Sequence, residues 1–505
     1  LTLVLDTHAA VERHSRSFDA DAHHALARRA AGESVVLLKN DDALLPLAEG
    51  TRVAVIGDFA ETPRYQGAGS SAVNSIKVDT FLDCLNDSGL HSVGFAPGFD
   101  RQGKPDAAKQ AEAVALAAEA DAVLLCLGLD EIKESEGLDR ADMKLADNQI
   151  ELLQAVREAN PNTVVIVNAG ASLETPWLAH CKALVYGALG GQAGAGAMVD
   201  VLTGKINPGG KLAETWANAY DDTPARDHFA GPGRTVQYRE GLYVGYRYYQ
   251  TAGVPVAFPF GHGLSYTQFA YSDLHADAHS ATLTVTNTGD RAGAEIVQLY
   301  VAKPNAEIFR PAQELKAFAK VQLAAGESKT VTLTLDDKAF RYWNTRTESW
   351  EVEGGTYELR VGASSADIRL TAAVEVIGTD ALNPYAGKAL PHYQSGKVQT
   401  VPDAEWETLL GRPIPDDRVK IDRNMTLGEL NHGRSPLGWL VWAVMTALLN
   451  ASYKKGKPDL NVLFQYNMPL RALAKMTNGA ISMGMVDGIV MEVPVSYTHL
   501  TLPTT

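Results

Sequence analysis

The residues best suited to chemistry lie in a short acidic segment, residues 134–140 (ESEGLDR), called the carboxylate loop below. It follows an apolar run at 122–129 that is typical of a buried strand, and it precedes a helical pattern at 147–160. Loops at the carboxyl ends of such strands are where open α/β sheets bind ligands. Glu136 stands beside a glycine, and a carboxyl group placed there can be tuned to donate and accept a proton. From the loop alone, a solvated acidic turn is an equally good interpretation.

The elements that must position this loop alternate between strands and helices. Continuous apolar strands separated by helices predict a mainly parallel sheet with helices on both faces, in an α/β unit over residues 26–250. The sequence predicts strands at 34–38, 52–57, 122–129, 163–168 and 183–186, and helices at 25–33, 107–120, 147–160, 176–180 and 193–202. Near the end of the unit, alternating tyrosines predict a partly buried strand, at Tyr243, Tyr246, Tyr248 and Tyr249.

A different pattern follows over residues 265–378. Short runs such as 281–286 and 330–335 alternate apolar and polar residues between turn clusters, which predicts an antiparallel β-sandwich. Trp343 and Trp350 could suggest a sugar-binding surface, but tryptophans in such sandwiches are more often part of the core, where we expect them.

The two ends of the chain differ from these units. Residues 1–25 are polar and predict a linker, with His23 and His24 as a linker pair, and residues 380–494 predict an extended and then helical tail. The last residues, 495–505, resemble a translated sequencing adapter and are expected to carry no fold information.

Composition narrows the function classes. A net charge of −15 argues against a nucleic-acid or anionic-membrane partner, since both require a basic surface. The three cysteines and 13 histidines show no spacing typical of disulfide frameworks or metal ligands, so we expect neither metal nor cofactor. The apolar stretch at 436–449 is shorter than the roughly 20 residues of a membrane span. The absence of a signal segment and the scarcity of cysteine favour a cytoplasmic protein.

Several motifs in register resemble the carboxyl-terminal half of glycoside hydrolase family 3, the β-glucosidase family. The resemblance covers about residues 25–378. The motifs are VLLKN at 36–40 with LPL at 45–47, VIG at 55–57 with RYQGAGSS at 64–71, the carboxylate loop, GGQAG at 190–194, NPGGKL at 207–212, REGLYVGYRYY at 239–249 and FPFGHGLSY at 258–266.

The resemblance implies an α/β sandwich domain followed by a fibronectin type III-like domain. It places the family's general acid/base on Glu136, with Glu134 as second choice. The family's nucleophile lies on a (β/α)8 barrel, which needs about 250 residues and does not fit upstream of residue 25. The resemblance therefore implies a fragment that lacks the nucleophile, is inactive alone, and has the missing barrel and a small β-glucoside as partners. The sequence leaves a homo-oligomer, β-xylosidase specificity and a non-catalytic carbohydrate- or protein-binding module open as alternatives.

Further residues would support the acid/base group. Asp139 and Arg140 could pair and hold the carboxylate loop in place. Partial burial and the negative charge of the partner carboxylate would keep Glu136 protonated near neutral pH. A second loop, at residues 64–71, lacks the Gly-Lys-Ser/Thr of a phosphate-binding loop. By resemblance this loop faces the active site. Its candidate residues are Arg64, Tyr65, Gln66, Gly67 and Ser70.

Overall fold

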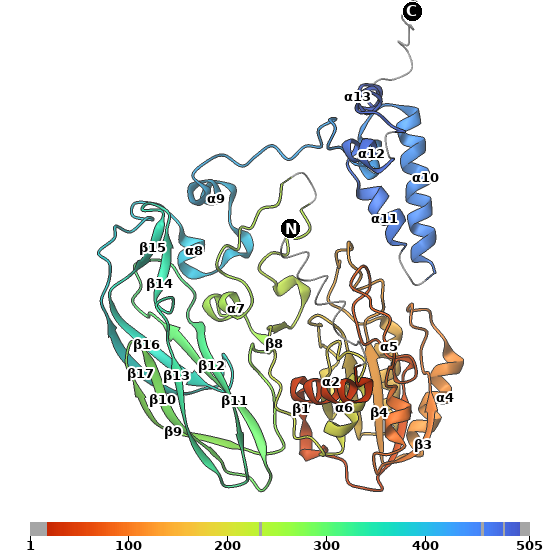
Figure 1. The fold of residues 1–505 in the computed structure, drawn as a ribbon, viewed down its shortest axis with the longest axis vertical. Helices are drawn as coiled ribbons and strands as arrows, with labels where there is room; N and C mark the ends of the chain where they lie inside the picture. The colour runs from red at the N-terminus through yellow and green to blue at the C-terminus, as the bar shows by residue number, and fades with distance from the viewer. Residues whose placement is uncertain (1–17, 232–234, 456–458, 478–479, 495–505) are drawn as a thin grey trace, which may run out of the picture.

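The computed structural model describes residues 18–231, 235–455, 459–477 and 480–494. The predicted adapter-like segment at 495–505 and the first 17 residues of the predicted linker lie outside these ranges. The described chain forms an α/β unit, a β-sandwich beside it, and a group of helices at one end of the α/β unit (Figure 1).

The α/β unit is built on one six-stranded sheet. Its strand order is β1-β6-β5-β4-β2-β3, and all neighbours are parallel except β1, which runs antiparallel to β6. The strands are β1 (Val36–Asn40), β2 (Arg52–Ile56), β3 (His91–Ala96), β4 (Ala122–Gly128), β5 (Thr163–Asn168) and β6 (Ala183–Tyr186). Every residue of β4, β5 and β6 is buried, as expected for central strands covered on both faces.

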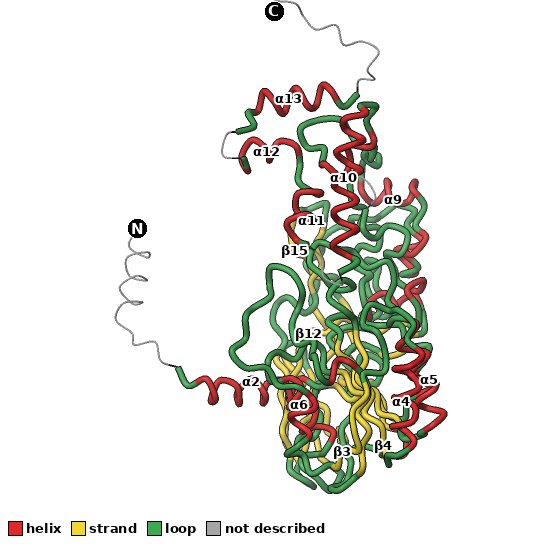
Figure 2. The backbone as a smooth tube through the Cα atoms, turned by 90° about the vertical axis from the view of Figure 1, so that its right-hand side faces the viewer, coloured by secondary structure: helices red, strands yellow, loops and turns green. Residues whose placement is uncertain are grey.

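Helices cover both faces of this sheet. Figure 2 shows α2 and α6 on one side of the strands and α4 and α5 on the other. The helices are α2 (Ala20–Ser34), α3 (Phe81–Leu85), α4 (Ala107–Ala118), α5 (Asp147–Ala159) and α6 (Gly194–Leu202). The sequence missed β3, an edge strand with only one fully buried residue, because its apolar signal is weak. The helix predicted at 176–180 is only a 3-10 turn, Leu178–His180.

The predicted linker is wrong where it meets the first described helix. α2 begins at Ala20, and the side chain of Asp19 caps it by accepting a hydrogen bond from the Ala22 amide at 2.9 Å. His24 is buried in this helix, with Nε2 2.9 Å from Oδ1 of Asp79. His24 is therefore part of the packing between α2 and the sheet unit.

The β-sandwich has two antiparallel sheets and a separate hairpin. The sheets have the orders β13-β10-β9 and β12-β11-β16-β17. Along β10 every second residue is buried, which confirms the alternating pattern. The strands are β9 (Phe269–Ala276), β10 (Ser280–Asn287), β11 (Gly293–Ala302), β12 (Glu314–Leu323), β13 (Ser328–Thr334), β16 (Gly355–Gly362) and β17 (Ile368–Val376), and the hairpin is β14 (Arg341–Asn344) with β15 (Ser349–Val352).

Two predictions about aromatic residues are wrong. Trp343 and Trp350 lie on the hairpin and are exposed rather than in the core. The predicted tyrosine strand is instead largely helix α7 (Tyr246–Ala252), although all four tyrosines are buried as expected. The short strands β7 (Trp216–Ala217) and β8 (Val256–Phe258) pair on either side of this segment.

The tail after the sandwich folds in two parts. The first contains α8 (Pro391–Ser395) and α9 (Asp403–Leu410) and shares an apolar core with α7. The second is a helical group with its own small core and comprises α10 (Pro436–Tyr453), α11 (Leu460–Asn467), α12 (Leu470–Met476) and α13 (Met483–Glu492). Among the described residues, no helix is both long and apolar enough to cross a membrane.

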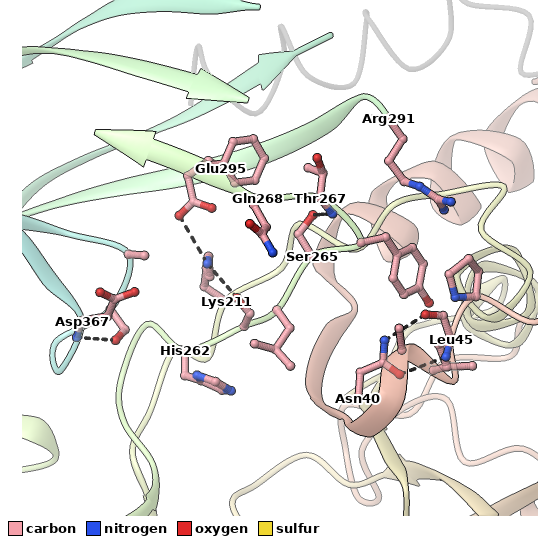
Figure 3. A pocket seen from close by; sticks show the side chains of 18 of the residues that line it. Asn40, Leu45, Lys211, His262, Ser265, Thr267, Gln268, Arg291, Glu295 and Asp367 are labelled. Atoms are coloured by element: carbon pink, nitrogen blue, oxygen red, sulfur yellow. Dashed lines mark hydrogen bonds and ion pairs between the residues drawn. The ribbon is translucent and has the colours of Figure 1, made fainter. Parts of the chain in front are cut away.

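A buried ion pair joins the α/β unit to the sandwich. Figure 3 shows Lys211 beside Glu295. Both residues line a hollow of about 900 Å³ whose lining comes from both units. The Lys211 ammonium lies 3.4 Å from the Glu295 carboxylate and donates a hydrogen bond to the carbonyl of Gly263 at 2.8 Å. The Lys211 side chain is 10% exposed and that of Glu295 4%, so this contact lies within the packed boundary between the two units.

Candidate active site

The carboxylate loop is held against a second loop that follows β2. Ala68 and Ser135 form a parallel bridge, and the amide of Glu136 donates to the carbonyl of Ala68 at 3.0 Å. The Ser70 amide donates to Oε2 of Glu136 at 2.6 Å, and the Ser70 hydroxyl donates to the same oxygen. Two segments more than 60 residues apart thus fix the position of one carboxylate.

Gly69 allows this close approach. Its φ is +121°, and a Cβ atom there would lie 2.5 Å from Cβ of Glu136. No larger residue fits without moving the carboxylate, so Gly69 belongs to the site although the sequence did not single it out. The glycine-rich composition of residues 67–69 is the one signal that could have indicated it.

Glu136 is solvent-exposed. The hydrogen bonds from the Ser70 hydroxyl and amide stabilise the charged form and lower the pKa of the Glu136 carboxyl group. The expected partial burial of Glu136 is therefore wrong for this chain, and the expected effect of a partner carboxylate stays a prediction. An ionised, exposed carboxylate can accept a proton. To donate a proton near neutral pH, it needs an environment that raises its pKa.

The helical group reaches this loop. Gly137 has a φ of +78°, and a Cβ atom there would lie 3.0 Å from Cδ2 of Leu463 in α11. Leu463 itself is buried. This contact between residues more than 300 positions apart has no sequence signal, and it makes α11 a neighbour of Glu136.

Glu134 has a different environment. Its carboxylate accepts hydrogen bonds from the amide of Gly170, at 2.9 and 3.0 Å to its two oxygens, and forms an ion pair with Arg64. The side chain of Arg64 is 2% exposed and that of Glu134 10%. Arg64 also donates to the carbonyl of Leu129 at 2.9 Å. Glu134 therefore joins the base of the carboxylate loop to the ends of β4 and β5.

The expected pair between Asp139 and Arg140 is not formed. Among the described residues Asp139 makes no hydrogen bond or ion pair, whereas Arg140 points inward and donates to the carbonyl of Ser172 at 3.3 Å. Burial lowers the pKa of Arg140, and the carboxylate of Glu134 acts in the opposite direction. Arg140 thus contributes positive charge beneath the loop without contacting Asp139.

The remaining candidates shape the second loop. The Gln66 side chain closes it by donating to the carbonyl of Val73 at 3.0 Å and accepting from the Val73 amide at 2.9 Å. The Tyr65 carbonyl accepts a hydrogen bond from the amide of Gly191 at 2.9 Å. Gly67 lies between them, with Ser71 Oγ 3.3 Å from the position a Cβ would take. Within the described ranges, no group of three or more His, Cys, Asp or Glu side chains is arranged to hold a metal ion.

Fold and site together define a class: a mostly parallel α/β sandwich that presents a carboxylate at the carboxyl end of its sheet, followed by an antiparallel β-sandwich. Residues 35–266 match the glycosyl hydrolase family 3 C-terminal domain, and residues 295–365 match a fibronectin type III-like domain. The two matches show that the chain contains the C-terminal domain of glycosyl hydrolase family 3 followed by a fibronectin type III-like domain.

Individual relatives agree with this family. An exo-alpha-(1->6)-L-arabinopyranosidase of Bifidobacterium breve is 44% identical over 400 residues, which are 76% of this chain and 53% of the relative. Thermostable beta-glucosidase B of Acetivibrio thermocellus is 43% identical over 379 residues, 73% of this chain and 50% of the relative. The crystal structure of a Bifidobacterium adolescentis GH3 beta-glucosidase superposes with a TM-score of 0.73 at 43% identity, covering 79% of this chain and 60% of that one. The chain thus spans about half the length of the curated relatives it matches.

Proposed function

We propose that Glu136 is the general acid/base of a retaining, exo-acting β-glucosidase whose nucleophile is supplied by a barrel domain outside this chain. One observation carries the choice between the two glutamates. Glu136 is exposed at the loop tip, whereas Glu134 is held by Arg64 and the amide of Gly170. A proton shuttle must reach the substrate, whereas the Glu134 carboxylate is directed at Arg64 and the amide of Gly170.

In this proposal Glu136 acts twice. The protonated carboxyl group donates its proton to the glycosidic oxygen while the nucleophilic carboxylate attacks the anomeric carbon, and the aglycone leaves as an alcohol. The Glu136 carboxylate then takes a proton from water, which attacks the same carbon and releases the sugar and the nucleophile. The two carboxyl groups must lie about 5–5.5 Å apart for this sequence of steps.

The pKa of Glu136 follows from this pairing. In this chain the bonds from Ser70 lower it. Docking of a barrel would exclude water and bring a second carboxylate close, and both effects raise a carboxyl pKa. Formation of the covalent intermediate removes the second charge, which lowers the pKa again when Glu136 has to act as a base. Ser70 would then favour the ionised form needed in the second step.

The substrate class rests on the relatives. Thermostable beta-glucosidase B of Acetivibrio thermocellus and the beta-glucosidase of Bifidobacterium adolescentis are each 43% identical to this chain. An α-L-arabinopyranoside is the second candidate, because the arabinopyranosidase relative is 44% identical.

Two other points remain predictions: the unit boundaries at 26–250, 265–378 and 380–494, and a cytoplasmic location.

Complementation tests the proposal. The chain is mixed with a separately produced family 3 barrel domain and assayed with p-nitrophenyl β-glucoside, alongside Glu136→Gln and the matched control Asp139→Asn. Asp139 is a carboxylate in the same loop that has no partner among the described residues. We expect activity in the mixture, a loss of at least 100-fold in Glu136→Gln, consistent with general acid/base contributions of about 10²–10⁴, and little change in Asp139→Asn. Azide should restore turnover of an activated aryl glucoside by the Gln variant. Full activity of Glu136→Gln would refute the assignment.

A further inference from the structure

Two exposed tryptophans on the β14–β15 hairpin have no role in the proposed reaction. Trp343 and Trp350 pair directly across the hairpin, with ring centroids 5.4 Å apart and ring planes at 75°. They are 46% and 54% exposed. Figure 1 places the hairpin at one end of the β-sandwich, away from the six-stranded sheet. We propose that this tryptophan pair is a binding site for β-linked glucan chains, separate from the carboxylate loop.

The geometry of the pair suits a ligand with flat apolar faces. Perpendicular rings form a corner in which the face of one indole meets the edge of the other. The guanidinium of Arg341 lies 4.9 Å from the Trp350 ring centroid and covers part of that ring. A ring stacked in this corner would therefore contact aromatic surface and lie beside a cation that can donate hydrogen bonds.

The polar surroundings select a ligand that also carries hydroxyl groups. In the described part of the chain, neither indole N–H has a hydrogen-bond partner. An alkyl surface would leave these donors buried and unpaired, which is costly, whereas hydroxyls can satisfy them. The turn between the two strands adds further exposed hydrogen-bonding side chains, from Thr345, Arg346, Thr347 and Glu348.

Glucose is the pyranose that best fits these requirements. In a β-linked glucopyranose all hydroxyl and linking groups are equatorial, so both ring faces present only axial C–H groups while the rim carries the hydroxyls. Such a unit can stack on an indole and still bond to Arg341 and the indole N–H groups. A stable contact with another protein requires roughly 800 Å² per partner, whereas this apolar corner consists of two side chains surrounded by polar residues.

The site does not depend on the proposed hydrolytic role, because binding can be measured without turnover. The whole chain is run in native gels containing soluble mixed-linkage β-glucan, and cellohexaose is titrated by calorimetry. The variants are Trp343→Leu, Trp350→Leu and the double variant, in which an apolar cross-strand pair remains but planar rings do not. Trp439→Leu is the matched control, since Trp439 is 48% exposed and forms a similar perpendicular pair with Trp442 on α10.

We expect the glucan to retard the wild-type chain and Trp439→Leu alike, and cellohexaose affinity to fall at least tenfold in the double variant. Trp343→Phe keeps a planar ring and should retain binding within about threefold, while far-UV circular dichroism checks that each variant is folded. Equal retardation of wild type and double variant, or none of the wild type, would overturn the proposal. So would a double variant whose only change is a different oligomeric state, since the hairpin would then be a protein contact.

Discussion

The buried ion pair between Glu134 and Arg64 gives the sharpest prediction, because it separates two glutamates that are two residues apart. Glu134→Gln keeps the shape of the side chain and an oxygen for the Gly170 amide, but it leaves the Arg64 guanidinium uncompensated. Nε and Nη2 of Arg64 already have no hydrogen-bond partner in the described chain, so no other group there compensates the positive charge of Arg64 at these atoms.

The size of the effect follows from this burial. Removing one partner of a buried ion pair typically costs about 3–5 kcal/mol. Because Gln retains an acceptor, we expect the lower end, about 3 kcal/mol. For a unit of 150–250 residues each kcal/mol lowers the melting temperature by about 2–4 °C, so the α/β transition should fall by about 6–12 °C. Glu136→Gln, an exposed change, should shift it by less than about 2 °C.

Differential scanning calorimetry of the two variants measures this difference. A third variant, Arg64→Met with Glu134→Gln, removes the buried charge as well and should recover most of the lost stability, since apolar replacement of a buried pair is often neutral. Equal, small shifts for both single variants would refute the reasoning. They would mean that water or another group compensates Arg64 when Glu134 is neutral.

Three further predictions concern the carboxylate loop. Ser70→Ala should raise the carboxyl pKa of Glu136 toward its ordinary value, which ¹³C NMR of labelled glutamate measures; an unchanged pKa would contradict this. The lowered pKa contributes stability above the unfolded pKa that is lost as pH falls through the folded pKa, so this contribution should become smaller in the variant. Leu463→Ala should speed amide exchange in the carboxylate loop, measured by mass spectrometry; identical exchange would mean that α11 does not support it. Gly69→Ala should destabilise the chain more than Gly191→Ala in urea unfolding. A Cβ at Gly69 meets Glu136 within 3 Å at a φ of +121°, whereas Gly191 has a φ of +73° and no atom within 4 Å of its Cβ position; equal losses would contradict the tight contact at Gly69.

Periodicity in the sequence was sufficient for the main architecture. The central strands of the α/β unit are continuous apolar runs, and in β5 and β6 the predicted bounds match the structure. Burial on both faces imposes that pattern, so it can be read without knowing the neighbours. The alternation in β10 is equally local, because one face of this strand is buried and the other is partly exposed to solvent.

Local patterns failed where burial depends on distant partners. The tyrosines around α7 are buried in a helix that packs against α8 and α9, which lie more than 140 residues later. The exposure of Trp343 and Trp350 depends on a hairpin that stands apart from both sheets. His24 is buried because Asp79 lies opposite it, and no periodicity near residue 24 indicates this.

The sequence by itself determined the chemistry available at the site: two glutamates separated by one serine, the buried strand before them, and a motif in which Glu136 precedes Gly137. Only the tertiary structure decided how each glutamate is held, because its contacts and exposure depend on groups brought in from elsewhere in the chain. Arg64 and Gly170 hold Glu134 in the interior, whereas Ser70 and Gly69 leave Glu136 at the surface with a lowered pKa. Charge acts through space, and the distances between these groups are set by the fold.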